Sequence, residues 1–338
     1  MTAYNQLEIA EMPAPAPGKD DLLIRIKACG ICGSDVHGMD GSTGRRIPPI
    51  VMGHEASGIV EAVGAAVTGF KAGDRVTFDS TVYCGECFHC KRGEVNLCEN
   101  REVIGVSTPA FRRMGAFAEL VTVPARIAYR LPDALPFEHA ALIEAVSVAV
   151  HAVKLTPVQP GDTALVVGAG MIGLLALQAV RAAGVERVLV ADVDETRLAM
   201  AREMGAAVTL NPKTAEFAAQ LQAQTDGRGA DVVLECVGTK ATVQLAMESV
   251  RKGGVVTLVG NVTPTVELPL QWVVSRQIRL QGSCASSGEY PECMELMARG
   301  AIRVEKLLSA RAPLEEGAAW FRRLHDREPG LLKVVLEP

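Results

Sequence analysis

The sequence contains no basic tract, no apolar run of membrane-spanning length and few aromatic residues, which make up 4% of the chain. Its formal net charge is −5. A dedicated nucleic-acid binder is therefore not expected, because such proteins neutralise phosphates with clustered lysine and arginine. Residues 1–17 have neither the positive start nor the apolar core of a secretory signal. These absences predict a cytoplasmic protein that contacts neither nucleic acid nor a membrane and keeps its cysteines reduced.

The length of 338 residues suits two domains of ordinary size, and 49% apolar residues allow each of them a core. Residues 1–147 combine strand-like segments with many glycine and proline turns, which is typical of a β-rich domain. Across residues 148–284, short apolar strands alternate with helical patterns, so we expect a parallel sheet of the α/β class. Residues 285–338 offer two helices and a final strand.

Four cysteines follow one another with the spacing C-x2-C-x2-C-x7-C; they are Cys84, Cys87, Cys90 and Cys98. Four thiols this close together suit a closed tetrahedral zinc site, which stabilises a loop and leaves no ligand position open. The alternative is a pair of disulfides, and a reducing compartment disfavours it. The spacing therefore predicts one structural Zn²⁺.

A glycine-rich turn, Gly168-Ala169-Gly170-Met171-Ile172-Gly173, follows an apolar strand and precedes a helical pattern. That context makes the GxGxxG pattern a prediction of a dinucleotide site. Gly168 permits the tight turn, and Gly173 permits close packing of helix on strand. Gly170 lets the backbone approach a pyrophosphate at the positive end of the helix that begins near Met171.

An acid ends the next apolar strand, since Asp192 lies 19 residues beyond Gly173. A carboxylate at this place accepts hydrogen bonds from the adenosine ribose and repels the 2′-phosphate of NADP, so NAD is the expected cofactor. Arg197 weakens this preference, because a nearby arginine can accept a phosphate. The alternative for Asp192 is a helix N-cap, for which Asp194 competes.

A second group of motifs contains further metal-binding residue types. Cys32, Ser34 and His37 lie in the first segment, His54 and Glu55 follow in a Gly-His-Glu triplet, and Glu144 begins a Glu-x-x-Ser-Val segment. Each piece alone is weak, because a single cysteine or histidine is more often a structural residue. An acid such as Glu144 in an apolar stretch is more informative, because burial of an unpaired carboxylate is costly.

Together with the four-cysteine loop and the GxGxxG turn, these motifs resemble the zinc-dependent medium-chain dehydrogenase family, and most of all its sorbitol and polyol dehydrogenase branch. The resemblance covers nearly the whole chain. It implies a GroES-like β-rich catalytic domain at 1–147, completed by 285–338, and a Rossmann domain at 148–284. Ethanol-type members of the family carry a cysteine where this chain has Glu144.

The resemblance also implies roles for individual residues. Cys32 and His54 match two ligands of a catalytic zinc, and Glu55 and Glu144 match acids that bind the metal or hold its water. Ser34 and His37 match a relay that moves a proton from the alcohol to solvent. A zinc with such ligands keeps one position open for substrate, acts as a Lewis acid and favours hydride transfer to the nicotinamide.

Three departures from sorbitol dehydrogenases concern the substrate. Gly38 stands where those enzymes typically have tyrosine, and the stretch 282–287 lacks their Arg-Tyr pair. The third departure is the adjacent pair Arg45 and Arg46, which is either a phosphate- or carboxylate-binding element or a solvated loop.

These observations predict an NAD- and zinc-dependent dehydrogenase that oxidises a secondary alcohol of a polyol or sugar derivative to a ketone. The alternatives within the family are dehydrogenases of threonine, a vicinal diol or a sugar-alcohol phosphate. A non-catalytic zinc- and NAD(P)-binding protein is the alternative from another class, and the complete set of motif residues argues against it. We expect a homotetramer or homodimer, with the apolar stretches 255–262 and 278–281 available for edge-strand pairing.

Overall fold

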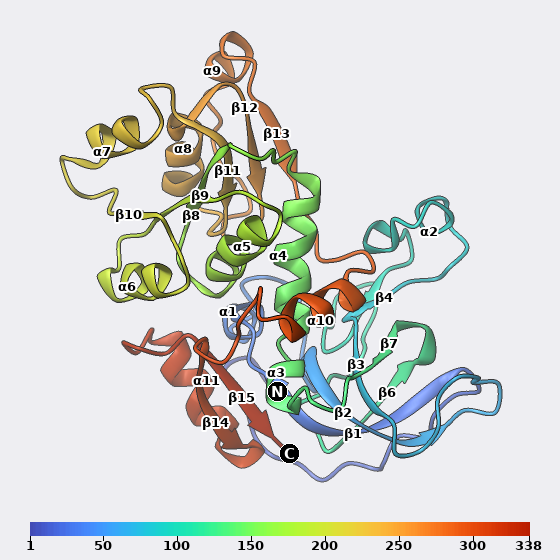
Figure 1. Cartoon of the computed structure of the whole chain (residues 1–338). Coiled ribbons are helices and arrows are strands. Elements are labelled where there is room, and N and C mark those ends of the chain that lie inside the picture. Colours follow the sequence, from blue (N-terminus) through green and yellow to red (C-terminus); the bar gives the residue numbers. More distant parts are fainter. The chain divides into compact units, whose positions relative to one another are not determined.

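The computed structural model describes residues 1–338, and the chain forms two compact units (Figure 1). Unit 1 comprises Met1–Glu144, Ser286–Ala298 and Val304–Pro338, and unit 2 comprises Ala145–Ala285 and Arg299–Arg303. The sequence placed the divisions at 147/148 and 284/285. The segment Arg299–Arg303, which the sequence analysis assigned to the first domain, belongs to unit 2 in the structure.

Unit 1 is built on a seven-stranded sheet with the order β14-β15-β1-β2-β3-β7, and β6 also pairs with β1. Its strands are β1 (Asp21–Gly30), β2 (Glu55–Val63), β3 (Arg75–Phe78), β6 (Leu120–Pro124), β7 (Ala128–Arg130), β14 (Leu308–Pro313) and β15 (Lys333–Glu337). Strand β1 alternates buried and half-buried residues, and Leu22, Ile24 and Ile26 lie in the core. The sheet therefore contributes core residues against which the rest of unit 1 packs.

The pairing of β1 with its neighbouring strands brings together the segments that carry the candidate active-site residues. Gly30 at the end of β1 is paired with Glu55 at the start of β2, and the same Gly30 is paired with Val335 of β15. The segments that follow β1 and precede β2 therefore lie next to each other, and the start of β15 lies beside both.

Short elements complete unit 1. They are the helices α1 (Gly33–Gly38), α2 (Phe88–Lys91), α3 (Phe137–Ala140), α10 (Tyr290–Ala298) and α11 (Gly317–His325), the strands β4 (Thr81–Val82) and β5 (Glu102–Val103), and the 3-10 turns η1 (Val95–Leu97), η2 (Ala125–Ile127) and η3 (Leu314–Glu316). Strands β4 and β5 form a separate two-stranded sheet.

Unit 2 contains a six-stranded parallel sheet with the order β10-β9-β8-β11-β12-β13. The strands are β8 (Thr163–Val167), β9 (Arg187–Ala191), β10 (Val208–Leu210), β11 (Ala230–Glu235), β12 (Val250–Leu258) and β13 (Arg279–Gly282). The helices are α4 (Ile143–Leu155), which begins in the last residues of unit 1, and α5 (Met171–Ala182), α6 (Glu195–Glu203), α7 (Phe217–Gln224), α8 (Lys240–Ser249) and α9 (Leu270–Ser275).

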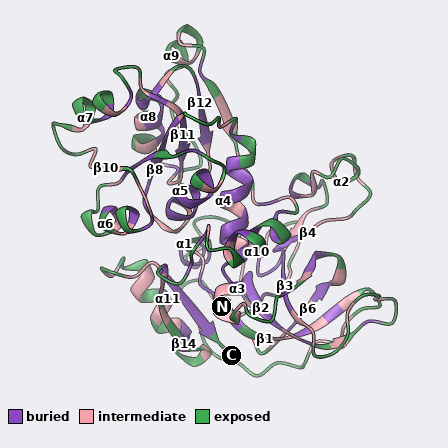
Figure 2. Cartoon of the chain, viewed as in Figure 1, coloured by how far each residue is buried: buried purple, intermediate pink, exposed green.

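Every residue of the central strand β8 is buried, as the purple colour in Figure 2 shows for the middle of this sheet. Continuous burial is what a strand needs when helices cover both faces of a parallel sheet. The strand order reverses between β8 and β11, and the carboxyl ends of the strands at such a point are where doubly wound sheets bind ligands. None of the helices is both long and apolar enough to cross a bilayer.

Candidate active site

Cys32, His54 and Glu55 bring their metal-binding atoms together within 4.8 Å of one another. Cys32 is the N-cap of α1, and Glu55 is the first residue of β2, directly after His54. The pairing of Gly30 with Glu55 is what brings these two segments together. One thiolate, one imidazole and one carboxylate are the three-donor arrangement of a catalytic zinc that keeps a position open. Three of the four predicted donors thus form one cluster.

Behind His54 lies a buried chain of charged groups. Asp35 Oδ2 is 3.4 Å from His54 Nδ1, and Asp35 Oδ1 accepts hydrogen bonds of 2.9 and 2.6 Å from Arg46 Nε and Nη2. Burial alone would raise the pKa of Asp35, but the charges of His54 and Arg46 hold this pKa well below its ordinary value. A carboxylate on the outer nitrogen of a metal-binding histidine fixes the ring and its tautomer.

Glu55 has a buried cation of its own. Lys333 Nζ lies 2.8 and 2.7 Å from the two carboxylate oxygens of Glu55 and also donates to the carbonyl oxygen of Ile31. Both side chains are almost completely buried. Burial opposes the charge of Lys333, yet Glu55 and Cys32 raise its pKa above the ordinary value. Glu55 therefore shares its charge between this lysine and any metal held by the cluster.

Glu144 lies close to this cluster but is not one of its mutually close donors. Its Oε1 accepts a hydrogen bond of 3.0 Å from Ser80 Oγ. Burial raises the pKa of Glu144 to about 7, against the positive charge of His54, and the neighbouring Glu55 and Asp79 add to the shift. A carboxyl group with this pKa can bind or release a proton near neutral pH.

Ser34 and His37 lie three residues apart on α1, both exposed. This spacing puts them on the same face of the helix. Ser34 Oγ accepts a hydrogen bond of 3.3 Å from Arg46 Nη2. The two residues of the predicted relay thus begin two residues after Cys32 and reach the solvent within one helical turn.

The paired arginines differ from the prediction. Arg46 is only 3% exposed and its guanidinium is bound to Asp35, so it is neither a solvated loop residue nor a free binding group for an anion. Only Arg45 is exposed. The sequence could not show this, because the partner of Arg46 lies 11 residues earlier on α1.

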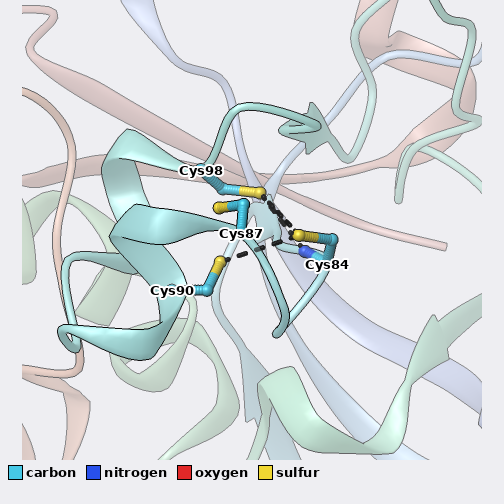
Figure 3. Close-up of side chains that lie close together, drawn as sticks. All are labelled: Cys84, Cys87, Cys90 and Cys98. Carbon is cyan, nitrogen blue, oxygen red and sulfur yellow. Dashed lines mark hydrogen bonds between the residues drawn. The ribbon is translucent and has the colours of Figure 1, made fainter.

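The four cysteines of the loop form the second cluster, with their sulfur atoms turned toward one another (Figure 3). All four are free thiols, and the sulfur of Cys84 lies 3.9 Å from that of Cys90 and 3.5 Å from that of Cys98. These separations exclude disulfide bonds, which need about 2.05 Å. Backbone N–H groups of Glu86 and Cys87 lower the pKa of Cys84 to about 6, which favours the thiolate that binds zinc.

In unit 2, the glycine turn lies at the carboxyl end of β8 and leads into α5, with Gly170 as its N-cap. Gly168 has a φ of +96°, and a Cβ on Gly173 would lie 1.7 Å from the carbonyl oxygen of Gly168, so only glycine fits there. A Cβ on Gly170 would meet nothing within 4 Å, which leaves open space beside the helix N-terminus. The turn therefore fits the pyrophosphate of a dinucleotide.

Asp192 follows β9, and its carboxylate is turned back to this glycine turn. Oδ2 accepts a hydrogen bond of 2.6 Å from the backbone N–H of Ala169, and Oδ1 accepts one from Asp194. Asp194 is the N-cap of α6, accepting from Thr196 and Arg197, so capping does not explain Asp192. The Arg197 side chain lies 3.8 Å from Asp194 and is partly exposed.

Asp35, Lys333 and Asp79 were not among the residues predicted from the sequence. Asp35 lies between Ser34 and Val36 in the segment that contains Cys32 and His37, so an acid close to a candidate metal ligand was a local signal for it. Lys333 carried no local signal, because it lies 278 residues from Glu55. Asp79 is buried, and its oxygens accept hydrogen bonds from Thr81 N–H and Ser286 Oγ.

Comparison with known proteins agrees with this geometry. Residues 18–133 match the alcohol dehydrogenase GroES-like domain and residues 172–299 match the zinc-binding dehydrogenase domain. The chain is 34% identical over 338 residues to the sorbitol dehydrogenase of Bacillus subtilis, covering 98% of this chain and 94% of the relative. It is 36% identical over 313 residues to the L-idonate 5-dehydrogenase of Vitis vinifera, covering 90% and 84%.

Among solved structures, the alcohol dehydrogenase TADH from Thermus sp. ATN1 is similar, with a TM-score of 0.92, 32% identity and coverage of 100% and 98% of the two chains. A zinc-binding dehydrogenase from Sinorhizobium meliloti 1021 bound to NADP has a TM-score of 0.89, 33% identity and coverage of 99% and 97%. The GroES-like and Rossmann folds are thereby confirmed, as is an oxidoreductase that acts on alcohol groups. The chain belongs to the zinc-dependent medium-chain dehydrogenase family, in its polyol dehydrogenase branch.

Proposed function

We propose that the protein is an NAD-dependent dehydrogenase that converts a secondary alcohol of an uncharged polyol or sugar derivative to a ketone. The observation that carries this proposal is the cluster of Cys32, His54 and Glu55, directly followed along α1 by Ser34 and His37. The zinc would be held by the three donors of the cluster, and a second zinc by the four cysteines. The donor types suit zinc in both places, three with an open position and four closed.

Bound zinc would supply a Lewis acid that makes the substrate hydroxyl more acidic, and bound NAD would accept the hydride. The chain's own residues handle the proton. Ser34 Oγ accepts it from the hydroxyl, and the exposed His37 on the same helix face passes it to solvent. Glu144, whose pKa is about 7, stands beside the donor cluster and holds water or substrate there through a hydrogen bond.

The choice of NAD rests on Asp192. Asp192 follows β9, and its carboxylate faces the glycine turn at the end of β8; a negative charge where the ribose would lie opposes the 2′-phosphate of NADP. Arg197 does not offset it, because this side chain is nearest to the carboxylate of Asp194. The relative from Sinorhizobium meliloti binds NADP, so cofactor choice varies within the family.

The substrate class rests on Arg46. An arginine pair at 45–46 was the feature that favoured phosphorylated or acidic sugars. Since Arg46 neutralises Asp35 inside the protein, this feature is reduced to the single exposed Arg45. Uncharged polyols, like the sorbitol in the name of the Bacillus subtilis relative, are the better match.

The test is NADH formation by zinc-loaded protein on polyols, diols, sugar-alcohol phosphates, aldonates, threonine and simple alcohols, with NAD and NADP in parallel. The expected result is turnover of one or more uncharged polyols with NAD, abolished by a chelator. Faster turnover of phosphates or aldonates would contradict the substrate class. No turnover, with two zincs and NADH still bound, would favour a non-catalytic binding protein.

We also propose that the protein self-associates through unit 2. Strand β13 forms the edge of the sheet, and helix α9 just before it exposes Leu270 and Val274 by 70% and 72%. Such apolar exposure beside an open strand edge supports pairing with a second copy. Light scattering should give a dimer or tetramer, and Val274→Lys should shift it toward the monomer. A native chain that stays monomeric at high concentration would contradict this.

A further inference from the structure

The guanidinium of Arg46 is completely engaged inside unit 1. Nε and Nη2 donate to Asp35 Oδ1 at 2.9 and 2.6 Å, Nη2 also donates to Ser34 Oγ at 3.3 Å, and Nη1 donates to the carbonyl oxygen of Arg45 at 3.0 Å. Ser34 is the proposed proton acceptor, and Asp35 contacts the ring of His54. A single buried cation therefore contacts both the proton relay and the support of a metal ligand.

The place of Arg46 is fixed by its surroundings. The backbone on either side of it is bound to the buried Ser107, whose carbonyl oxygen accepts from Ile47 and whose N–H donates to Arg45. Helix α1 leaves room for its side chain at Gly38, because a Cβ there would lie only 2.6 Å from Arg46 Cγ. Gly38 has no need of a left-handed conformation, so close approach is the reason for glycine here.

We propose that Arg46 is a positioning residue that aligns two parts of the active site at once, the His54 ring through Asp35 and the Ser34 hydroxyl directly. The inference rests on the proposed function, since the roles of His54 and Ser34 come from it. It goes beyond that function by assigning to Arg46 a role in both metal retention and proton transfer.

The contact between Arg46 and Asp35 affects the affinity of the site for its metal. With Oδ1 held by Arg46, Asp35 keeps Oδ2 3.4 Å from His54 Nδ1, where its negative charge favours a proton on Nδ1 and leaves Nε2 to bind a cation. Without Arg46, Asp35 would be a buried carboxylate that keeps the His54 ring, 3.4 Å away, but has no cation and no fixed orientation. Loss of an outer partner of this kind typically costs 10–100-fold in metal affinity.

The contact between Arg46 and Ser34 affects the transfer of the substrate proton. When Ser34 Oγ accepts a hydrogen bond from Arg46 Nη2, its second lone pair stays available to the substrate hydroxyl and its own hydrogen points elsewhere. Lysine at this position would keep the charge beside Asp35 but, as a point charge without a planar fork, would not reach both partners in the same geometry. The two effects are therefore separable by substitution.

The experiment compares Arg46→Gln, Arg46→Lys and, as a control, Arg130→Gln, which removes an exposed Arg–Asp pair of unit 1 between β7 and Asp74. Zinc affinity is measured by chelator competition, with the four-cysteine zinc as internal reference, and kcat and the KM for NAD are measured on the best polyol.

For Arg46→Gln we expect one zinc bound about 10–100-fold more weakly, at least about 10-fold lower kcat and an unchanged KM for NAD. Arg46→Lys should regain most zinc affinity but not kcat, and Arg130→Gln should match the native chain.

Gly38→Ala provides a second route if Arg46→Gln does not fold. It removes no charge, and in a helix alanine is otherwise favoured over glycine, so weaker zinc binding would come from the displaced arginine. Native zinc affinity and kcat in Arg46→Gln, or in Gly38→Ala when it is the only folded variant, would overturn the inference. A native chain with two zincs but no turnover would overturn the proposed function and leave the zinc measurement to decide on Arg46. A native chain that binds only one zinc would overturn both.

Discussion

Asp79 should make the stability of the folded chain depend on pH, and this dependence can be measured directly. The side chain is buried in unit 1, where Thr81 N–H and Ser286 Oγ donate to its two oxygens and no cation is among its hydrogen-bond partners. Burial raises its pKa from an ordinary 3.8 to about 6, and the neighbouring Glu289 adds to the shift. Between pH 3.8 and about 6, the folded chain therefore holds a proton on Asp79 that the unfolded chain has already released.

The direction in which stability changes with pH follows from the difference between the pKa of Asp79 in the folded and in the unfolded chain. Because the folded state has the higher pKa, stability is lost as the pH rises from the unfolded pKa to the folded one, and the loss is complete above about pH 6. The difference between the two pKa values corresponds to about 3 kcal/mol, of which about 1.5 kcal/mol develops between pH 5 and pH 8. Asp79→Asn cannot ionise and keeps an oxygen for the Thr81 N–H, so it should lack this loss.

The assay is urea unfolding of the native chain and Asp79→Asn at pH 5 and pH 8. The chain has two tryptophans, Trp320 in α11 of unit 1 and Trp272 in α9 of unit 2, so a Trp272→Phe background makes fluorescence report on unit 1. We expect the stability advantage of Asp79→Asn to grow by about 1.5 kcal/mol from pH 5 to pH 8. The exposed Asp133→Asn serves as control and should show no such growth. An advantage that does not change with pH would refute the reasoning.

Three further predictions concern the sites. Cys32→Ala should abolish turnover and leave NADH binding, measured by fluorescence titration, nearly unchanged, because the glycine turn lies in the other unit; normal turnover would contradict the metal assignment. Asp192→Ala should raise the ratio of kcat/KM for NADP to that for NAD by removing the ribose acceptor, and an unchanged ratio would mean that another residue sets the preference. Cys98→Ser should lower the zinc content by about one per chain and lower the thermal midpoint, since a structural zinc contributes folding free energy; retention of both zincs would exclude the four-cysteine site.

The features that the sequence predicted well are those whose partners lie close together along the chain. The four cysteines span 15 residues, and the glycine turn needs only its flanking strand and helix, so spacing alone carries the information. The alternation of strands and helices likewise predicted the parallel sheet, because each βαβ unit is local. The fold class therefore followed from local patterns.

What the sequence could not show is which buried charges meet. Lys333 reaches Glu55 only because β15 pairs with β1, and Ser286 reaches Asp79 across 207 residues. The interpretation of Arg46 was wrong for the same reason, since an arginine on a loop looks solvated until its acceptor is known. Long-range pairing thus determines the electrostatics of the site, while its donors Cys32, His54 and Glu55 were predicted through the family resemblance and are brought together by the pairing of β1 with β2.

The buried acids of unit 1 differ in pKa according to whether a buried cation faces them. Asp35 faces Arg46 and His54, and its pKa is held well below the ordinary value, so it stays ionised and can orient a ligand without exchanging a proton. Glu144 accepts a hydrogen bond from the neutral Ser80, and burial raises its pKa to about 7, so it can exchange a proton at physiological pH. Neighbouring acids whose environments drive their pKa values apart are the usual sign of separate roles. The positions of the buried cations, far more than the acids themselves, therefore decide which carboxylate stays ionised and which one can exchange a proton.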